Sequence, residues 1–509
     1  MENKNKLLYS RDNKYEKVGL EDLSLNVESV PQKSGNNWLQ YAATASVCLF
    51  SMTAGITYSW TSPALPHLRS NNSEIPITQV EGAWIATSVD IGSFSGNIVF
   101  LFIANYLGRK NSLLMIAIPY IIACLMIVLA KNVITLYVSR FIMGMITDFV
   151  FALVSTYIGE ISDKEIRGIL LIGIRISLSL GQMYVKIAGV LFSYKTMNIM
   201  IMIIPLLFFA TFFFMPESPY YLLLKNQRKK ALKTLMKLKG HKVPGMIHLE
   251  LERIEKSVKE SQESKKWKFR ELFAVKGNRR SLYIAMLAWA TKHSSGSLSI
   301  HAFTQDIFEE TGISLAPEIC AMIIAIIGVT MAIIATFIIE RAGRRITFLF
   351  SGLFCALGLA LVGLSFFLKT YFKADVESIT WLPLAGLIVY EIAFSLGLAY
   401  IPIILMGEIF ALSVKMPAVF IVHTTISIFL IIIKISFQWL NNMAGIYTTF
   451  WTYAICSFFG SIIFFCIAPE TKGKTLEEIQ DNIHANNVRK FQKSDEIIKE
   501  KIIVTDVSD

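Results

Sequence analysis

The sequence predicts an all-α membrane protein whose twelve transmembrane helices form two six-helix bundles. Composition is the first observation behind this prediction, because 54% of the 509 residues are hydrophobic and only 17% are charged. The second is that the apolar residues gather in runs of about 20, the length that crosses roughly 30 Å of hydrocarbon. The third is a set of charged motifs that occurs once in each half of the chain. Backbone polar groups in lipid must be satisfied within their own segment, so each run is expected to be a helix.

Twelve apolar runs flank a basic central segment, with six on each side. An even number of spans puts both termini on the same side of the membrane. Lys and Arg outnumber Asp and Glu by three to one in residues 225–280, and short basic loops stay in the cytoplasm. Both termini are therefore expected to be cytoplasmic. The spans lie at about 41–62, 80–104, 112–130, 133–157, 168–191, 196–215, 281–303, 317–339, 346–368, 378–406, 414–440 and 446–467.

These spans divide the chain into five parts. The linker between the bundles holds two charged stretches with helical spacing, RKKALKTLMKLK and LELERIEKSVKE, which predict short surface helices. The polar first 40 residues are too long for the start of a signal peptide, so the first helix is expected to insert uncleaved. The parts are a cytoplasmic tail (1–40), a first bundle (41–215), a cytoplasmic linker (216–280), a second bundle (281–467) and a second cytoplasmic tail (468–509).

Charge and cysteine content exclude several classes of function. A net charge of +11 could indicate a nucleic-acid partner, but the basic residues fit the cytoplasmic loops of a membrane protein, so no nucleic acid is expected. The six cysteines lie in apolar runs and none forms a CxxC pair, which predicts neither disulfides nor a metal site. No P-loop, HExxH or GxSxG motif is present, so we expect no enzyme activity and no cofactor.

Three charged motifs of the first half recur in the second half. Each follows an even-numbered span, so all six are expected on the cytoplasmic side. Parallel six-helix repeats with a site between them near the midplane are a common plan of transporters. We expect an Arg of one motif to meet a Glu of another and to close the inner end when the site faces outward; the alternative is that these charges only fix topology. The pairs are NYLGRK (105–110) with ERAGRR (340–345), GEISDKEIRG (159–168) with GEIFALSVK (407–415), and PESPYYLL (216–223) with PETKGKTL (469–476).

At these motifs, and at SRFIMG (139–144), the sequence resembles the sugar porter family of the major facilitator superfamily. The resemblance covers about 40–475, and TSPALPHL (61–68) and GAWIATSVDIG (82–92) look like its insect facilitated trehalose transporter branch. It implies the major facilitator fold, facilitative transport of a sugar such as trehalose or glucose, and a plasma-membrane location. It also implies a cytoplasmic gate, for which the candidates are Arg109, Lys110, Arg140, Glu160, Arg167, Glu217, Glu340, Arg344, Arg345, Glu408, Lys415 and Glu470.

The expected sugar-binding positions depart from the family pattern. Lys292 and His293 stand where the family carries a pair of Gln residues, and Arg175 stands at a further Gln position. Gly296 and Pro402 are kept. These five residues are the candidate substrate-binding residues. Sugar hydroxyls need neutral donors and acceptors, because an unpaired buried polar group costs about 1–3 kcal/mol. Loss of the amides therefore leaves one alternative to sugar transport, a carrier of a non-sugar or anionic solute. A second alternative is a sensor that binds without transport and engages partners through the basic linker and the tail.

Several charged residues lie inside the predicted spans. Arg175 and Lys186 are eleven residues apart, about three turns, and share a face of their helix. A charge at mid-bilayer costs about 2.5–3.5 kcal/mol, so each should face a partner or the central site. A structural ion pair of Asp148 with Arg175 is one alternative, and a cationic site is the other. The further intramembrane charges are Asp90, Glu391 and Lys434.

Three smaller features bear on coupling, modification and partners. Thr53 stands where proton-coupled family members typically carry an acidic residue, so the resemblance favours uniport over coupling through His293. Asn71-Asn72-Ser73 is a glycosylation sequon in a loop expected outside the cell. The expected partners are a small solute, most simply a sugar, and membrane lipid, which the basic linker and tail could bind through anionic headgroups. We expect a monomer or a weak oligomer.

Overall fold

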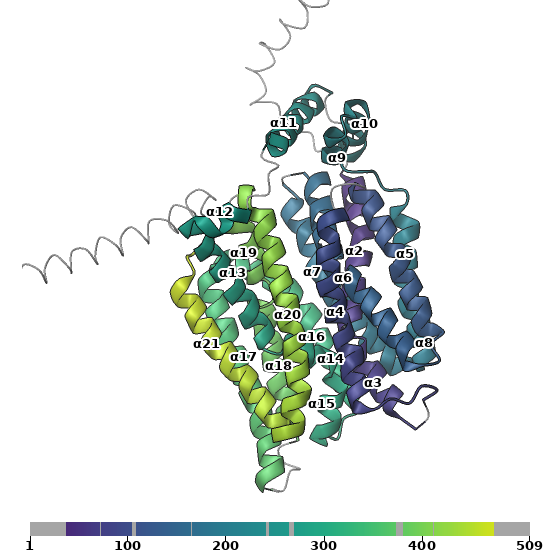
Figure 1. Cartoon of the computed structure of the whole chain (residues 1–509), viewed down its shortest axis with the longest axis vertical. Helices are drawn as coiled ribbons and strands as arrows, with labels where there is room; N and C mark the ends of the chain where they lie inside the picture. Colours follow the sequence, from purple (N-terminus) through teal and green to yellow (C-terminus); the bar gives the residue numbers. More distant parts are fainter. Residues whose placement is uncertain are drawn as a thin grey trace, which may run out of the picture.

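The computed structural model describes residues 37–472 except 72, 104–107, 164, 241–243, 264–268, 373–379 and 411. The described chain is helical, and two bundles stand side by side in Figure 1. The first bundle consists of α2 (Trp38–Ser59), α3 (Thr61–Arg69), α4 (Gln79–Ile103), α5 (Arg109–Val128), α6 (Val133–Ile161), α7 (Arg167–Leu191) and α8 (Tyr194–Phe212). The second consists of α13 (Lys276–Ser294), α14 (Ser297–Ala302), α15 (Thr304–Thr311), α16 (Pro317–Ala342), α17 (Arg344–Phe367) with η1 (Leu368–Phe372), α18 (Leu382–Leu396), α19 (Ile401–Glu408), α20 (Leu412–Ala444) and α21 (Ile446–Ile467).

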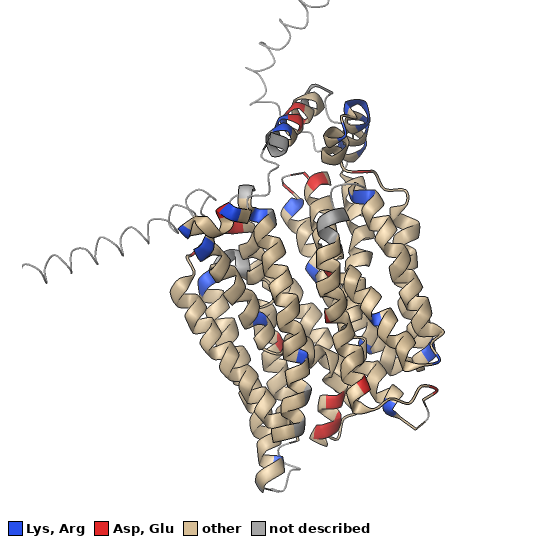
Figure 2. Ribbon diagram, viewed as in Figure 1, with Lys and Arg blue, Asp and Glu red and all other residues tan. Residues whose placement is uncertain are grey.

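The predicted fold class is confirmed. Ten helical segments of the described chain are long and apolar enough to cross a membrane. The two remaining predicted spans are α4 and the broken run α13–α15, which pack within the same bundles. Figure 2 shows charged residues concentrated at the two ends and on the linker helices, with few along the middle of the bundles. This distribution fits a hydrocarbon core around the middle, where charge is costly.

Two predicted spans are interrupted, which the apolar pattern did not predict. The span expected at 281–303 breaks after Ser294, because Gly296 adopts a φ of +76° that a helix cannot continue. The span expected at 378–406 is interrupted between Leu396 and Ile401, and α19 starts with Pro402 in its first turn, where a missing N–H is tolerated. Both breaks fall in the interior of the second bundle.

Helices within a bundle approach closely at glycines. A Cβ at Gly55 in α2 would lie 1.9 Å from the Leu178 carbonyl oxygen of α7, and one at Gly181 in α7 would lie 2.1 Å from the Met52 carbonyl oxygen. Between membrane helices, where water-driven association is absent, such small residues allow backbone packing. The close approach of α2 and α7 therefore requires glycine at these two positions.

Four linker helices lie beyond one end of the bundles (Figure 1): α9 (Pro219–Leu224), α10 (Arg228–Lys239), α11 (Pro244–Glu263) and α12 (Phe269–Ala274). Apolar side chains of α9, α10 and α11 form a small core of their own. The last turn of α10 docks on the first bundle, because Gln40 Nε2 donates to the Leu238 carbonyl at 3.0 Å and Lys239 Nζ lies 2.8 Å from Asp163 Oδ1. Since the basic linker is expected in the cytoplasm, we call this end the inner end.

Two pairs of helices make the most extensive contacts between the bundles. α7 of the first bundle packs on α16 of the second, and α4 packs on α20. At the opposite end from the linker, the short helices α3 and α15 also meet, and Figure 1 shows both at the bottom of the molecule. These contacts join the halves along the middle and at the outer end.

Candidate functional site

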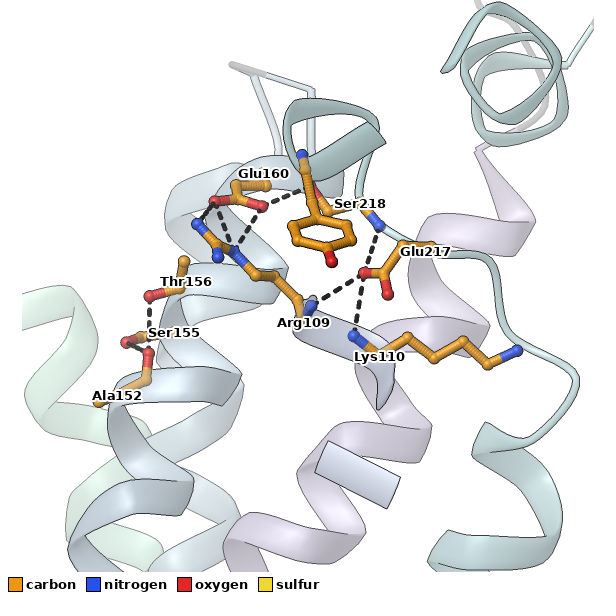
Figure 3. Close-up of polar contacts among 9 residues, drawn as sticks. Arg109, Lys110, Ala152, Ser155, Thr156, Glu160, Glu217 and Ser218 are labelled. Atoms are coloured by element: carbon orange, nitrogen blue, oxygen red, sulfur yellow. Dashed lines mark hydrogen bonds and ion pairs between the residues drawn. The ribbon is translucent and has the colours of Figure 1, made fainter. Parts of the chain in front are cut away.

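Arg109 and Glu160 form the centre of a charged cluster at the inner end of the first bundle (Figure 3). Arg109, the first residue of α5, places Nη2 3.0 Å and Nε 3.1 Å from Glu160 Oε1 in the last turn of α6. Ser218 Oγ donates to the other oxygen of the same carboxylate. Such charge-assisted hydrogen bonds are about twice as strong as neutral ones. The cluster therefore ties the ends of α5 and α6 to the start of the linker.

Glu217 caps the start of α5. Its Oε1 accepts from the backbone N–H groups of Arg109 at 3.0 Å and Lys110 at 2.9 Å. The first N–H groups of a helix have no partner within the helix, and the positive end of the dipole favours a carboxylate there. Gly108 precedes them with a φ of +85°, and a Cβ on it would lie 2.7 Å from Glu217 Oε2. The glycine of the motif thus allows the carboxylate to approach.

The second half reproduces this arrangement. Arg344 Nη2 lies 3.2 Å from Glu408 Oε1. Glu470 accepts from the backbone N–H groups of Arg344 at 3.0 Å and Arg345 at 3.1 Å, and Gly343 before them has a φ of +84°. Each Glu of the third motif therefore caps the helix that begins in the first motif, as the sequence repeat suggests.

The second basic residue of each first motif also has an equivalent role. Lys110 Nζ donates to the Phe213 carbonyl at 2.7 Å, and Arg345 Nε donates to the Phe465 carbonyl at 2.5 Å. These carbonyls lie at the ends of α8 and α21, the last helix of each bundle, where cations are favoured by the negative end of the helix dipole. The inner end of each bundle is thus stabilised within that bundle.

Two other gate candidates, Arg167 and Lys415, make no ion pair with a carboxylate among the described residues. Arg167 Nη2 donates to the Ser162 carbonyl at 3.1 Å, and Lys415 Nζ lies 3.4 Å from the Gly407 carbonyl, both within their own motifs. Glu340 lies on α16, but its side chain is outside the described part of the structure. Neither Arg167 nor Lys415 therefore joins the Arg–Glu clusters.

The prediction that Arg140 belongs to the inner gate is wrong. Arg140 lies in the second turn of α6, at the outer part of the bundle, whereas Glu160 lies in the last turn of the same helix. Its Nη2 donates to the Thr57 carbonyl at 2.7 Å, and its guanidinium lies 4.9 Å from the Trp60 ring centroid. Because Glu160 lies at the inner end of α6, residues near the start of this helix, such as Arg140, lie far from the inner cluster.

Ion pairs between the halves lie elsewhere. At the outer end, Arg69 Nη1 of α3 lies 2.9 Å from Asp306 Oδ2 of α15. Inside the interface, Lys434 Nζ of α20 lies 2.6 Å from Asp90 Oδ2 of α4, and both side chains are buried. In the described structure the Arg–Glu pairs of the inner end stay within one half each.

The candidate substrate-binding residues gather near the break between α18 and α19. Arg175 of α7 places its guanidinium 5.4 Å from the Tyr400 ring centroid. Lys292 of α13 donates from Nζ to the Ala399 carbonyl at 3.2 Å. Pro402, buried in the first turn of α19, follows Ala399 by three residues. The unwound residues 397–400 thus receive a cation from each half.

His293 and Gly296 lie at the other break. His293 is buried, and its ring stacks on Trp289 with centroids 5.6 Å apart. Neither ring nitrogen has a hydrogen-bond partner among the described residues. Gly296 is the left-handed residue that separates α13 from α14, and Tyr453 fills the space where its side chain would be. Both therefore lie at this break, His293 in the last turn of α13.

Other intramembrane charges acquired partners that sequence reasoning did not identify. Asp148 accepts from Tyr58 Oη at 2.9 Å instead of forming the structural ion pair with Arg175 that was one alternative. His301 Nε2 lies 3.7 Å from Glu391 Oε2, and Lys186 Nζ lies 3.2 Å from Thr304 Oγ1. The only sequence signal was the presence of charge in apolar runs, which predicts a partner without naming it. The described residues contain no group of three or more His, Cys, Asp or Glu that could hold a metal ion.

Comparison with known proteins adds two findings. A sequence model described as "Sugar (and other) transporter" matches residues 40–482. Among curated relatives, Facilitated trehalose transporter Tret1-1 of Drosophila simulans and Trehalose transporter 1 of Drosophila melanogaster are each 28% identical over 445 residues, covering 87% of this chain and 52% of the relative. Facilitated trehalose transporter Tret1 of Anopheles gambiae is 28% identical over 444 residues, covering 87% and 56%. The chain thus spans about half the length of these relatives.

Solved structures share the fold. The inward open conformation of the xylose transporter XylE from E. coli has a TM-score of 0.71 at 20% identity, covering 87% of this chain and 99% of that one. The proton:xylose symporter XylE bound to 6-bromo-6-deoxy-D-glucose has a TM-score of 0.70 at 20% identity, covering 88% and 99%. This chain therefore has the major facilitator fold.

Proposed function

The chain belongs to the sugar (and other) transporter family, and we propose that it carries a sugar across a membrane by alternating access. Trehalose or a hexose such as glucose is the proposed solute, and the names of the curated trehalose transporters support this choice. We place the protein in the plasma membrane as a multi-pass protein with both termini in the cytoplasm. It acts as a monomer or a weak oligomer, without a cofactor.

The duplicated charged cluster is the observation that carries this proposal. Arg109 with Glu160 and Arg344 with Glu408 occupy equivalent places, and each cluster stays within one bundle. Each half is therefore held together at its inner end by its own ion pairs and helix caps. Two such rigid halves, joined along the α7–α16 and α4–α20 contacts, support rocking about a central site.

The ion pairs between the halves indicate which end of the protein is closed in this conformation. Arg69 and Asp306 close the outer end, while the described Arg–Glu pairs of the inner end do not cross between halves. We propose that this conformation opens toward the cytoplasm. In the opposite conformation, the outer pair separates and the two inner clusters approach each other. The two states must lie within a few kcal/mol for turnover.

The environment of Thr53 supports uniport. Its hydroxyl donates to the Phe50 carbonyl at 2.6 Å, and the side chain is buried without a charge. A neutral group at this position has no proton to exchange. The solute gradient would then be the energy source, and a pH gradient should not drive accumulation.

Uptake into proteoliposomes tests the proposal. We expect saturable uptake of labelled trehalose or glucose by the purified chain, with the same rate with and without a pH gradient. Empty liposomes and the double variant Arg109→Ala with Arg344→Ala are the controls, the latter because it removes both inner ion pairs. Sugar binding without uptake would instead identify a sensor, and pH-driven accumulation would contradict uniport.

A further inference from the structure

Two cations from opposite halves meet at the break in the tenth span. Arg175, from α7 of the first bundle, lies over the ring of Tyr400, with 5.4 Å between guanidinium and ring centroid. Lys292, from α13 of the second bundle, donates to the carbonyl of Ala399 at 3.2 Å. Ala399 and Tyr400 are consecutive residues in the unwound segment between α18 and α19. The two positive charges therefore converge on one point between the halves.

Neither cation has a carboxylate partner within ion-pair distance among the described residues. Only 9% of Lys292 is exposed, and the buried Nε of Arg175 has no hydrogen-bond partner in the described structure. The nearby carboxylate of Asp148 accepts from Tyr58 at 2.9 Å. This situation differs from that of Lys434, which is also buried but has Asp90 Oδ2 at 2.6 Å from its Nζ.

A second carboxylate, that of Glu391, lies in the same interior region, and its Oε2 has no hydrogen-bond partner among the described residues. Glu391 of α18 lies 3.7 Å from His301. It also lies against Gly328 of α16, where a Cβ would be 2.7 Å from Glu391 Oε1. The Arg175 and Lys292 charges are therefore not neutralised by a direct contact of the protein with itself.

An aromatic ring next to each cation partly compensates for its missing carboxylate partner. The Lys292 ammonium lies 4.6 Å from the Trp289 ring centroid, as the Arg175 guanidinium lies over Tyr400. A cation over an aromatic face gains less than a cation with a carboxylate. Lys and Arg donate hydrogen bonds and accept none, so a ligand here must supply acceptors. An anionic group is the ligand that satisfies both the charge and the donors.

We propose that Arg175 and Lys292 together bind an anionic group, a carboxylate or a phosphate, on a sugar-like solute. The inference rests on the proposed transport function and narrows its solute to sugar acids or sugar phosphates, which should bind more tightly than trehalose or glucose. The planar fork of Arg175 suits a carboxylate or phosphate oxygen pair, and Lys292 adds a point charge from the other half. Because one cation comes from each half, the anion draws the halves together when it binds.

Matched solutes test this inference by binding. Glucuronate differs from glucose by a carboxylate in place of one hydroxymethyl group, and glucose 6-phosphate carries the phosphate alternative. A ligand that binds the folded protein raises its melting temperature with concentration. We expect glucuronate or glucose 6-phosphate to stabilise the purified chain at concentrations at least tenfold lower than glucose or trehalose. Comparison of the two anions distinguishes carboxylate from phosphate recognition.

Substitutions assign the effect to the two cations. Arg175→Gln and Lys292→Gln should each weaken anion binding by about tenfold to a hundredfold, as expected for the loss of a hydrogen bond to a charged group. Lys292→Arg keeps the charge and should retain most of the affinity. Arg175→Lys keeps the charge but loses the planar pair of donors, so its affinity should lie between those of Arg175→Gln and the unaltered protein. Lys195→Gln, which removes an exposed Lys on α8, should bind as the unaltered protein does. Without ligand, the two Gln variants should melt no lower than the unaltered protein, because no internal ion pair is broken.

The outcomes separate this inference from the transport proposal. Stabilisation by an anion together with its uptake into proteoliposomes supports both. Stabilisation and uptake of neutral sugars alone overturn the anion site and leave transport intact. Anion binding without uptake of any solute supports the site and overturns transport. Absence of both binding and uptake in the unaltered protein overturns both. This last outcome is measured without any variant, so misfolding of a variant cannot explain it.

Discussion

Arg69 and Asp306 link the two six-helix halves at their outer end, with 2.9 Å between Nη1 and Oδ2. Thr304, two residues before Asp306, is fully buried and accepts a hydrogen bond from Lys186 of the other half at 3.2 Å. The ion pair and the buried contact behind it form an outer closure made of α3 and α7 from the first half and α15 from the second. This closure has no counterpart among the motifs that the sequence repeats.

Opening of the outer closure can be measured from outside the membrane. In Asp306→Asn the ion pair is lost, and we expect a cysteine introduced at Thr304 to react several-fold faster with a membrane-impermeant maleimide. A partly exposed pair contributes up to about 1 kcal/mol, which corresponds to roughly a fivefold change in the open population. The charge swap Arg69→Asp with Asp306→Arg should restore slow labelling. Equal labelling in all three proteins would contradict the closure.

The buried pair of Asp90 and Lys434 should matter more for stability than the outer pair. Its side chains are 1% and 4% exposed, so removing one partner leaves an uncompensated buried charge. We expect Lys434→Met to destabilise the protein by about 3–5 kcal/mol, measured by unfolding in mixed micelles. The double variant Asp90→Asn with Lys434→Met should recover most of this loss. A double variant as unstable as the single one would show that packing, and not charge, is responsible.

The cap formed by Glu470 predicts a pH dependence. Burial raises the pKa of this carboxyl, but the backbone N–H groups that it accepts from outweigh burial and hold the pKa below 4.5. The folded protein thus binds the proton more weakly than the unfolded chain, so the cap stabilises the protein above pH 4.5 and this stability is lost as the pH falls through the lowered pKa. The donors are Arg344, Arg345, Thr471 and Lys472.

Melting temperatures of Glu470→Gln and the unaltered protein between pH 7 and pH 3.5 check this dependence. The Gln variant should melt lower at pH 7, because a neutral amide interacts less well with the start of α17. The difference should shrink toward acid. A difference in melting temperature that is constant from pH 7 to pH 3.5 would exclude the charge of Glu470 as its cause.

Gly296 should not tolerate a side chain. Its φ of +76° costs an L-residue roughly 1–2 kcal/mol. A Cβ would also lie 2.2 Å from Tyr453 Cδ2, so the ring must move. We expect Gly296→Ala to lower both the melting temperature and the uptake rate. Gly159→Ala is the matched control, because a Cβ there meets nothing within 4 Å and α6 favours Ala over Gly.

Asn71 tests the orientation of the chain. It is exposed in the loop between α3 and α4, at the end opposite the linker. If this end faces the outside, glycosidase treatment of the protein from animal cells should reduce its apparent mass, and Asn71→Gln should remove that change. An unmodified Asn71 together with glycosylation engineered into 225–280 would place the linker outside and reverse the proposed topology.

Much of the fold followed from local features of the chain. Hydrophobic runs of bilayer length require helices, because backbone groups in lipid have no other partner. The repeated motifs correctly predicted which residues form equivalent clusters, since Arg109 and Arg344 each begin a helix and meet a Glu from the next motif. These predictions depend on the spacing and charge of nearby residues, and they do not depend on how the helices pack against one another.

The packing of the two halves determined which charged residues of distant helices become partners. The partner of Lys434 is 344 positions away at Asp90, and that of Arg69 is 237 positions away at Asp306, distances at which no local pattern carries information. The same holds for the convergence of Arg175 and Lys292 on residues 397–400, which depends on where two helices break. Apolar runs specify that a helix crosses the membrane, but Leu, Ile and Phe pack against many surfaces alike. Which charges become neighbours is therefore decided by helix packing and by the breaks at Gly296 and Gly397.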